Sequence, residues 1–216
     1  MNVLIVGGGG REHALIRKLK ESKRCGAIHC APGNGGIAAD AVCVPQISAT
    51  DIGAIVDFAV SHAVGFAVVA PDDPLALGMV DALEDAGIPA FGPRADAAII
   101  EASKIFSKNL MAKYHIPTAK YQTFTELAPA LAYIEAEGAP IVVKADGLAL
   151  GKGVIVATEL EQAEEAVREC FGGTFGDAGN TVVIEEMLTG PECSLLAFTD
   201  GKTVRPMACL LYTSPS

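Results

Sequence analysis

Short runs of apolar residues alternate with longer amphipathic segments over the first hundred residues of the chain. The short runs are rich in valine, isoleucine and alanine, which is typical of buried β-strands. In the segments between them, apolar residues recur at helical spacing. The predicted strands are 2–6, 27–31, 66–70 and 88–91. One predicted helix begins after residue 10, and the others occupy 52–60, 75–86 and about 94–114.

This alternation predicts the fold class of the first part of the chain. Strands that alternate with helices, with connections long enough to cross over, indicate an α/β protein with a doubly wound parallel sheet. In such a sheet, ligands bind beyond the carboxyl ends of the strands. We therefore assign residues 1–102 to a Rossmann-like domain, and we expect the helix after it to act as a connector.

The pattern changes after Pro117 and becomes that of an α+β region. The expected elements are a helix at 125–137, a strand, loop and strand at 140–157, a helix at 159–170, strands at 181–186 and 193–199, and a return strand at 202–206. We expect one subdomain at 103–192 and the start of a second at 193–216. From about Met207 the strand pattern breaks, so the chain looks truncated with an atypical tail.

The amino-acid composition narrows the classes of molecule that the protein could bind. Half of the 216 residues are hydrophobic, and 16 basic against 26 acidic side chains give a net charge of −10. This balance argues against nucleic acid or an anionic membrane, but it allows a small anionic ligand at a local cationic site. No apolar run approaches the ~20 residues of a membrane span, and the N-terminus lacks a basic signal region. The six cysteines form no C-x-x-C pair, so we expect reduced thiols and a cytoplasmic protein.

The stretch 140–153 joins two β-branched runs through a loop rich in glycine and lysine. Glycine lets backbone N–H groups approach phosphate oxygens, and Lys144 and Lys152 add positive charge. The loop is not a Walker A motif, because three residues separate Gly147 from Gly151 and a glycine follows the second lysine. From these residues alone, a phosphate-binding flap and an ordinary glycine-rich hairpin both remain open.

A second glycine turn, at 7–10, follows the first strand and opens a helix. This context suits anion binding, because backbone N–H groups and the helix dipole face the loop, and Arg11 adds a charge. It is not the dinucleotide fingerprint: Glu12 stands where the third glycine is required, and Ala31-Pro32 replaces the ribose-binding acid. A ligand-binding loop and a plain tight turn both fit.

Further polar groups gather at the same predicted edge. The loops 31–36 and 70–74 follow the second and third strands, so with the first glycine turn they predict a cleft. His13 could act there as a base, although a histidine on a helix is more often packed or solvated. In the second region, the pair Glu185-Glu186 could be a solvated strand end or could accept a hydrogen bond from a sugar hydroxyl. Lys104, taken alone, would be a solvated lysine.

Together these segments resemble the ATP-grasp ligases, and within them the glycinamide ribonucleotide synthetase (phosphoribosylamine–glycine ligase) family of purine biosynthesis. The resemblance covers about residues 2–206. Its most specific segments are Gly-Gly-Arg-Glu-His-Ala at 9–14 and Lys-Ala-Asp-Gly at 144–147. The others are Ala-Pro-Gly-Asn at 31–34, Phe-Gly-Pro at 91–93, Glu-Ala-Ser-Lys at 101–104, Ile-Pro-Thr-Ala at 116–119, Phe-Gly-Asp-Ala-Gly at 175–179 and Glu-Glu-x-Leu-x-Gly-x-Glu at 185–192.

The resemblance implies roles for the matching positions. ATP would be bound by Lys104, Lys144, Gly147, Gly151, Lys152, Gly153, Glu185, Glu186, Leu188 and Glu192. The phosphoribosylamine site would be bordered by Gly9, Gly10, Arg11, Glu12, His13, Pro32, Gly33, Asn34, Asp72 and Asp73. The two lysines at 104 and 144 would hold phosphates, the segment 185–188 would receive the adenine and Glu192 the ribose. The ligands of Mg²⁺ (or Mn²⁺) would lie beyond the chain, which itself offers no identifiable metal ligand or catalytic residue.

Two positions depart from the family pattern. Gly8 stands where the family often has Asn or Ser. Ala-Pro-Asp-Asp-Pro-Leu at 70–75 replaces the more usual Gly-Pro-Glu-x-Pro-Leu, which keeps an acid but shortens it by one methylene.

The implied reaction joins glycine to 5-phosphoribosylamine with ATP, through a glycyl phosphate, and yields glycinamide ribonucleotide, ADP and phosphate. Such chemistry needs positioning and charge neutralisation more than a protein nucleophile. We expect a monomer, and we expect this chain alone to be inactive. Two alternatives remain: another ATP-grasp ligase with a different acid and amine, and a nucleotide-binding module or dinucleotide enzyme.

Overall fold

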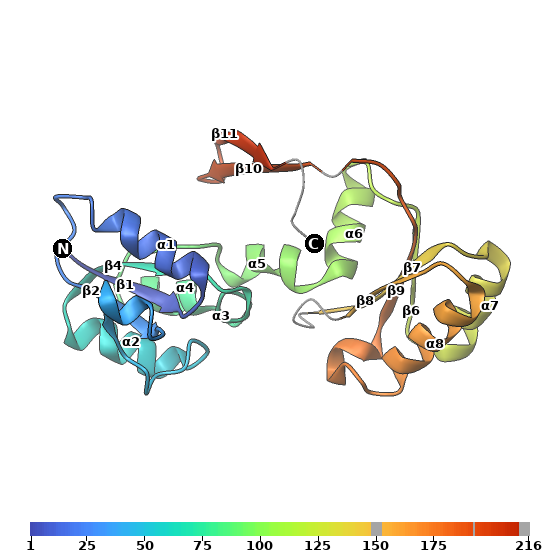
Figure 1. Cartoon of the computed structure of the whole chain (residues 1–216), viewed down its shortest axis with the longest axis horizontal. Helices are drawn as coiled ribbons and strands as arrows, with labels where there is room; N and C mark the ends of the chain where they lie inside the picture. The colour runs from blue at the N-terminus through green and yellow to red at the C-terminus, as the bar shows by residue number, and fades with distance from the viewer. Residues whose placement is uncertain (148–152, 192, 212–216) are drawn as a thin grey trace.

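The computed structural model describes residues 1–147, 153–191 and 193–211. Two bodies lie at opposite ends of the long axis, and helices α5 (Ala95–Ala102) and α6 (Lys104–Lys113) connect them (Figure 1). Among the described helices, none has the length and apolar character needed to cross a membrane.

The first body is built on a parallel sheet of five strands in the order β3-β2-β1-β4-β5. The strands are β1 (Asn2–Gly7), β2 (Ile28–Pro32), β3 (Val42–Cys43), β4 (Val64–Val69) and β5 (Ala90–Phe91). Its helices are α1 (Gly10–Leu19), α2 (Ile52–Ser61), α3 (Asp72–Ala76), α4 (Met79–Asp85) and the 3₁₀ turn η1 (Ile37–Ala39).

Both faces of this sheet are covered, as the continuous apolar runs predict. Successive side chains of a strand point to opposite faces. Ile5 therefore packs with Ile16 of α1 on one face, while Leu4 packs with Ile55 of α2 on the other. All four side chains are completely buried. The doubly wound parallel sheet expected from the sequence is confirmed.

Two helices predicted as continuous are interrupted. The predicted helix 75–86 is divided at Gly78, whose φ of +88° lies in the left-handed region that glycine adopts readily. The predicted helix 94–114 is divided at Ser103, which has an extended backbone and caps α6. The single-helix predictions were wrong at these two points, and the second break affects the site directly.

The second body is an antiparallel sheet of four strands in the order β6-β9-β7-β8. The strands are β6 (Tyr121–Phe124), β7 (Ile141–Ala145), β8 (Val154–Ala157) and β9 (Val182–Glu186). Helices α7 (Leu127–Glu137) and α8 (Leu160–Phe171) pack on one face, and the 3₁₀ turn η2 (Gly176–Asn180) precedes β9. The α+β region is confirmed, with β6 as a strand that the sequence analysis missed.

A hairpin of β10 (Ser194–Thr199) and β11 (Val204–Leu211) forms a separate two-stranded sheet (Figure 1). The strand pattern was expected to break near Met207, but β11 continues to Leu211. The pairing register shifts between Leu195 and Ala197, and Ala197 lies opposite Pro206. This irregularity accommodates a residue without an N–H group, so the ladder resumes beyond it.

Candidate functional site

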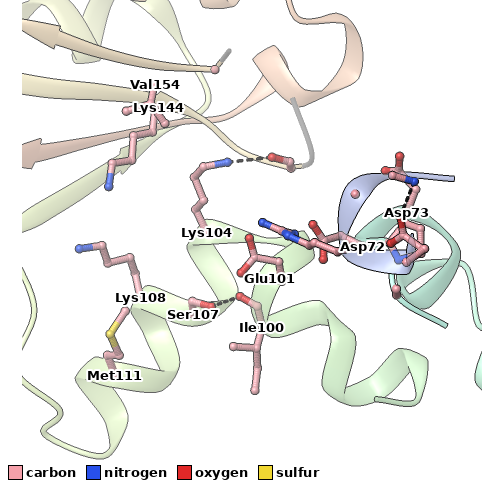
Figure 2. Close-up of a pocket in the computed structure, with 18 of the residues that line it drawn as sticks. Asp72, Asp73, Ile100, Glu101, Lys104, Ser107, Lys108, Met111, Lys144 and Val154 are labelled. Atoms are coloured by element: carbon pink, nitrogen blue, oxygen red, sulfur yellow. Dashed lines mark hydrogen bonds between the residues drawn. The ribbon is translucent and has the colours of Figure 1, made fainter. Parts of the chain in front are cut away.

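A cavity of about 930 Å³ lies between the two bodies. This volume falls within the roughly 300–1,000 Å³ of small-molecule sites. The turn 8–12 and the segment 70–73 form its wall in the first body, α5 and α6 contribute a second wall, and β7 to β9 supply the third. Figure 2 shows Asp72 and Asp73 on one side of the cavity and the three lysines 104, 108 and 144 on the other.

The periodicity of the second sheet places two charged groups at the cavity. Val143 of β7 and Ile184 of β9 point into the core that α7 and α8 cover. Their neighbours Lys144 and Glu185 therefore lie on the opposite face, away from α7 and α8. Both line the cavity, with Glu185 buried and Lys144 about a quarter exposed.

The interruption at Ser103 places Lys104 at the first position of α6. The hydroxyl of Ser103 caps the helix, and Asp146 accepts a hydrogen bond of 3.2 Å from the N–H of Ile105. Lys104 Nζ donates to the carbonyl oxygen of Gly147 at 2.8 Å. Burial lowers the pKa of Lys104, although the charge of Asp146 opposes the shift. The end of β7 and the start of α6 are thus held together at the cavity.

Lys108, Glu185 and Lys144 form a cluster of two cations around one buried carboxylate. Lys108 Nζ lies 2.9 Å from Glu185 Oε2, and Lys144 Nζ lies 2.9 Å from Oε1. Both contacts are ion pairs, and the buried Oε1 has no hydrogen-bond partner among the described residues. Lys108 also donates to the hydroxyl of Thr118 at 2.7 Å. The sequence analysis missed Lys108, whose one local signal is its place a turn after Lys104 on the same helix.

At the other end of the cavity, the first glycine turn begins α1. Gly9 N–H donates to the carboxylate of Glu12, which is buried and closes the turn. Asn34 donates to the carbonyl oxygen of Gly8 at 2.6 Å, and Gly33 N–H donates to Gly7 at 3.1 Å. The Ala-Pro-Gly-Asn loop therefore supports the glycine turn.

The close contact between these two loops makes Gly8 sensitive to substitution. A Cβ atom at Gly8 would lie 2.7 Å from the carbonyl oxygen of Gly33. We expect Gly8→Ser to lower the free energy of unfolding by about 1–3 kcal/mol, because overpacking forces the backbone to shift. Urea denaturation measures this change.

Gly10→Ala is the matched control, since nothing lies within 4 Å of a Cβ atom at Gly10. Alanine in the first turn of α1 should leave stability unchanged or raise it by up to ~1 kcal/mol. Equal destabilisation by the two substitutions would contradict the packing argument.

The residues expected to border the phosphoribosylamine site fall into two groups. Those that line the cavity are Gly9, Gly10, Arg11, Glu12, Asp72 and Asp73. Those outside its lining are His13, Pro32, Gly33 and Asn34. His13 instead contacts Asp40 through Nε2 at 2.9 Å. Hydrogen bonds from Lys20 and then His13 lower the pKa of Asp40 to about 2, so its carboxylate is a fixed partner for the histidine.

The residues expected to bind ATP are likewise divided. Lys104, Lys144, Gly147, Gly153 and Glu185 line the cavity. The Glu186 carboxylate accepts a hydrogen bond of 2.9 Å from the N–H of Lys120, and Leu188 is 68% exposed, so neither side chain reaches the lining. The predictions for Gly151, Lys152 and Glu192 lie outside the described residues.

The second body belongs to the ATP-grasp class of proteins, because residues 102–210 match an ATP-grasp domain model. The fold is shared with an ATP-grasp RimK domain protein from Sphaerobacter thermophilus, with a TM-score of 0.64 and 17% identity over 100% of this chain and 76% of that one. Residues 1–101 match the phosphoribosylglycinamide synthetase N domain, and residues 102–210 match its ATP-grasp (A) domain. The chain therefore belongs to the phosphoribosylglycinamide synthetase family.

The similar proteins share one name, phosphoribosylamine–glycine ligase. The chain is 53% identical over 210 residues to phosphoribosylamine–glycine ligase from Pasteurella multocida. The aligned region covers 96% of this chain and 49% of that relative. It is 53% identical over 209 residues to the Listeria monocytogenes serotype 4b ligase, with 96% and 50% covered. The solved Thermotoga maritima ligase has a TM-score of 0.77 and 28% identity, with 95% and 49% covered. The chain spans about half the length of the curated relatives it matches.

Proposed function

We propose that this chain contributes the ATP site and the adjacent amine-substrate site of a phosphoribosylamine–glycine ligase. The observation that carries the proposal is the cavity, which joins the lysines of α6 and β7 to the glycine turn of α1. The match to ligases of that name over 96% of the chain supports the same assignment.

The proposed roles follow from the chemistry of each wall. Lys104 and Lys144 would neutralise the phosphates of ATP as point charges. The segment 185–188 would receive the adenine. At the other end, the N–H groups of Gly10 and Arg11 begin a ten-residue helix, and that helix terminus suits the phosphate of phosphoribosylamine. Gly9 N–H is already satisfied by Glu12, so it is not assigned to the ligand.

The proposed reaction proceeds in two transfers. The glycine carboxylate attacks the γ-phosphorus of ATP, which forms glycyl phosphate and releases ADP. The amine of phosphoribosylamine then attacks the glycyl carbonyl, loses a proton and displaces phosphate. The residues of this chain would hold charge and orientation in these steps, a type of catalysis that relies on positioning.

Mg²⁺ (or Mn²⁺) is expected to accompany ATP, where it would offset negative charge on the phosphates. The 2-oxoglutarate carboxylase biotin carboxylase domain from Hydrogenobacter thermophilus, which shares the fold at a TM-score of 0.70, was solved with MgADP. Within the described residues, no group of three or more His, Cys, Asp and Glu side chains could hold a metal ion. We therefore assign no metal ligand to this part of the chain.

ATP binding by the chain can be measured by isothermal titration calorimetry, with GTP as the comparison. The proposal expects ATP to bind more tightly than GTP. The full reaction can be tested in a chimaera in which residues 1–210 replace the matching part of the Pasteurella multocida ligase. ADP formation should then require both glycine and phosphoribosylamine.

Two results would decide against this assignment. ADP formation that requires a different acid or amine would favour another ATP-grasp ligase. NADH binding without ATP binding would favour a dinucleotide protein.

A further inference from the structure

Lys108 is the most completely enclosed lysine at the cavity. Its side chain is 8% exposed, against 26% for Lys144. Its ammonium group lies 2.7 Å from the Thr118 hydroxyl, 3.5 Å from the carbonyl oxygen of Ala119 and 2.9 Å from Glu185 Oε2. The ammonium group donates hydrogen bonds to Thr118 and Ala119, and the Glu185 carboxylate is its ion-pair partner.

The Tyr121 ring adds to this enclosure. Lys108 Nζ lies 5.2 Å from the centre of the ring, within the range of a cation–π contact. Lys108 is therefore enclosed by partners from the chain itself, although it lines the cavity. Its effect on a ligand must pass through a group that it holds.

Glu185 is that group. One carboxylate oxygen, Oε2, lies 2.9 Å from Lys108 Nζ in an ion pair between two buried side chains. The other, Oε1, is buried at the cavity and makes no hydrogen bond. Lys144 Nζ lies 2.9 Å from it in a second ion pair, so the two ammonium groups share one buried carboxylate.

Removal of Lys108 would leave the Glu185 carboxylate with one neighbouring ammonium group instead of two. The carboxylate of Glu185 would keep Lys144 as its cationic neighbour in the cluster, and a buried charge seeks the best available partner. The carboxylate would turn toward Lys144 and form a full charge-assisted hydrogen bond with it. Lys144 would then be withdrawn from any anion in the cavity.

We propose that Lys108 is a positioning residue that holds Glu185 by Oε2 and thereby keeps Lys144 available to the phosphates of a nucleoside triphosphate. The inference rests on the proposed ATP site, and it concerns a residue that contacts no ligand itself. It predicts that Lys108 and Glu185 act on nucleotide affinity as one unit.

The first test compares Lys108→Met with Lys113→Met, the same substitution at an exposed position of the same helix. ATP affinity is measured by calorimetry. Lys108→Met should raise the Kd about tenfold or more, the equivalent of one charge-assisted hydrogen bond. Lys113→Met should leave the Kd unchanged. Equal affinity of the two variants would overturn the proposal.

A double-mutant cycle with Glu185→Gln separates positioning from a general loss of structure. If Lys108 acts through the Glu185 carboxylate, Lys108→Met should change the Kd by less than about threefold once Glu185→Gln is present. If the two substitutions instead change the Kd by independent factors, so that the double variant shows the product of both, the proposal is refuted. Should Lys108→Met fail to fold, Lys108→Gln keeps a donor for Thr118, loses the charge, and should give the same result.

A crystal structure of the Lys108→Met variant provides a readout that does not depend on ATP. The Glu185 carboxylate should have rotated into a hydrogen bond with Lys144. An unmoved carboxylate would contradict the inference even if ATP bound. Conversely, failure of the parent chain to bind ATP would count against the proposed function, while the position of the carboxylate would still decide the role of Lys108.

Discussion

Replacement of Glu185 by alanine should lower the free energy of unfolding by about 3–5 kcal/mol, because it leaves a buried ammonium group without its counter-ion. The Glu185 side chain is 6% exposed and that of Lys108 is 8% exposed, so bulk water solvates the remaining ammonium group poorly. Lys144 is less affected, since its side chain is 26% exposed. The change can be measured by urea denaturation monitored by circular dichroism.

Glu186→Ala is the matched control for this prediction. Glu186 is the next residue of β9, is exposed, and accepts one hydrogen bond from the N–H of Lys120. Its loss should cost no more than about 1 kcal/mol, as for an ordinary surface interaction. If the two substitutions destabilise the chain equally, the buried cluster is not the reason that Glu185 matters.

Lys144→Met should weaken ATP binding by roughly 10- to 150-fold, which corresponds to about 1.5–3 kcal/mol for a hydrogen bond to a charged group. The strand holds Lys144 on the cavity face, and its partial exposure leaves the ammonium accessible to a phosphate. Methionine keeps most of the side-chain volume and removes the charge. Stability should change little, because Glu185 retains Lys108 as a partner.

The control for this effect is Lys120→Met in the same body. Lys120 is exposed, pairs with Glu137 at 2.8 Å and does not line the cavity. Calorimetric titration of ATP into both variants and the parent chain gives the comparison. An affinity loss shared by Lys120→Met would indicate a non-specific effect of net charge, and an unchanged Kd for Lys144→Met would remove Lys144 from the ATP site.

Much of the fold could be predicted because its signals are local. The apolar runs gave four of the five strands of the parallel sheet, all but the two-residue β3, and their continuous apolar character gave its two covered faces. The break at Ser103 could not be read in the same way. Serine is a common N-cap, but the helical pattern continues through it, and Asp146, which stabilises the break, is 43 residues away.

The sequence predicted some residues of the candidate site and missed others, again because its signals are local. Motif segments led to Lys104, Lys144 and Glu185, all of which line the cavity. Lys108 has no motif signal, since its importance arises from a partner on a distant strand. His13 stood inside a specific motif, yet the structure pairs it with Asp40 away from the lining. Its role in substrate binding remains a prediction.

The contact between Ser103 and Asp146 has a consequence for the order in which the site is built during folding. The capping bond from Gly9 to Glu12 spans three residues, so the glycine turn can form early and locally. Lys104 reaches its place only when a contact spanning 43 residues has closed, and closing such a loop carries an entropic cost. We therefore expect the two ends of the cavity to form at different times during folding. A substitution that slows assembly of β7 would delay the seating of Lys104 while leaving the turn at α1 already formed.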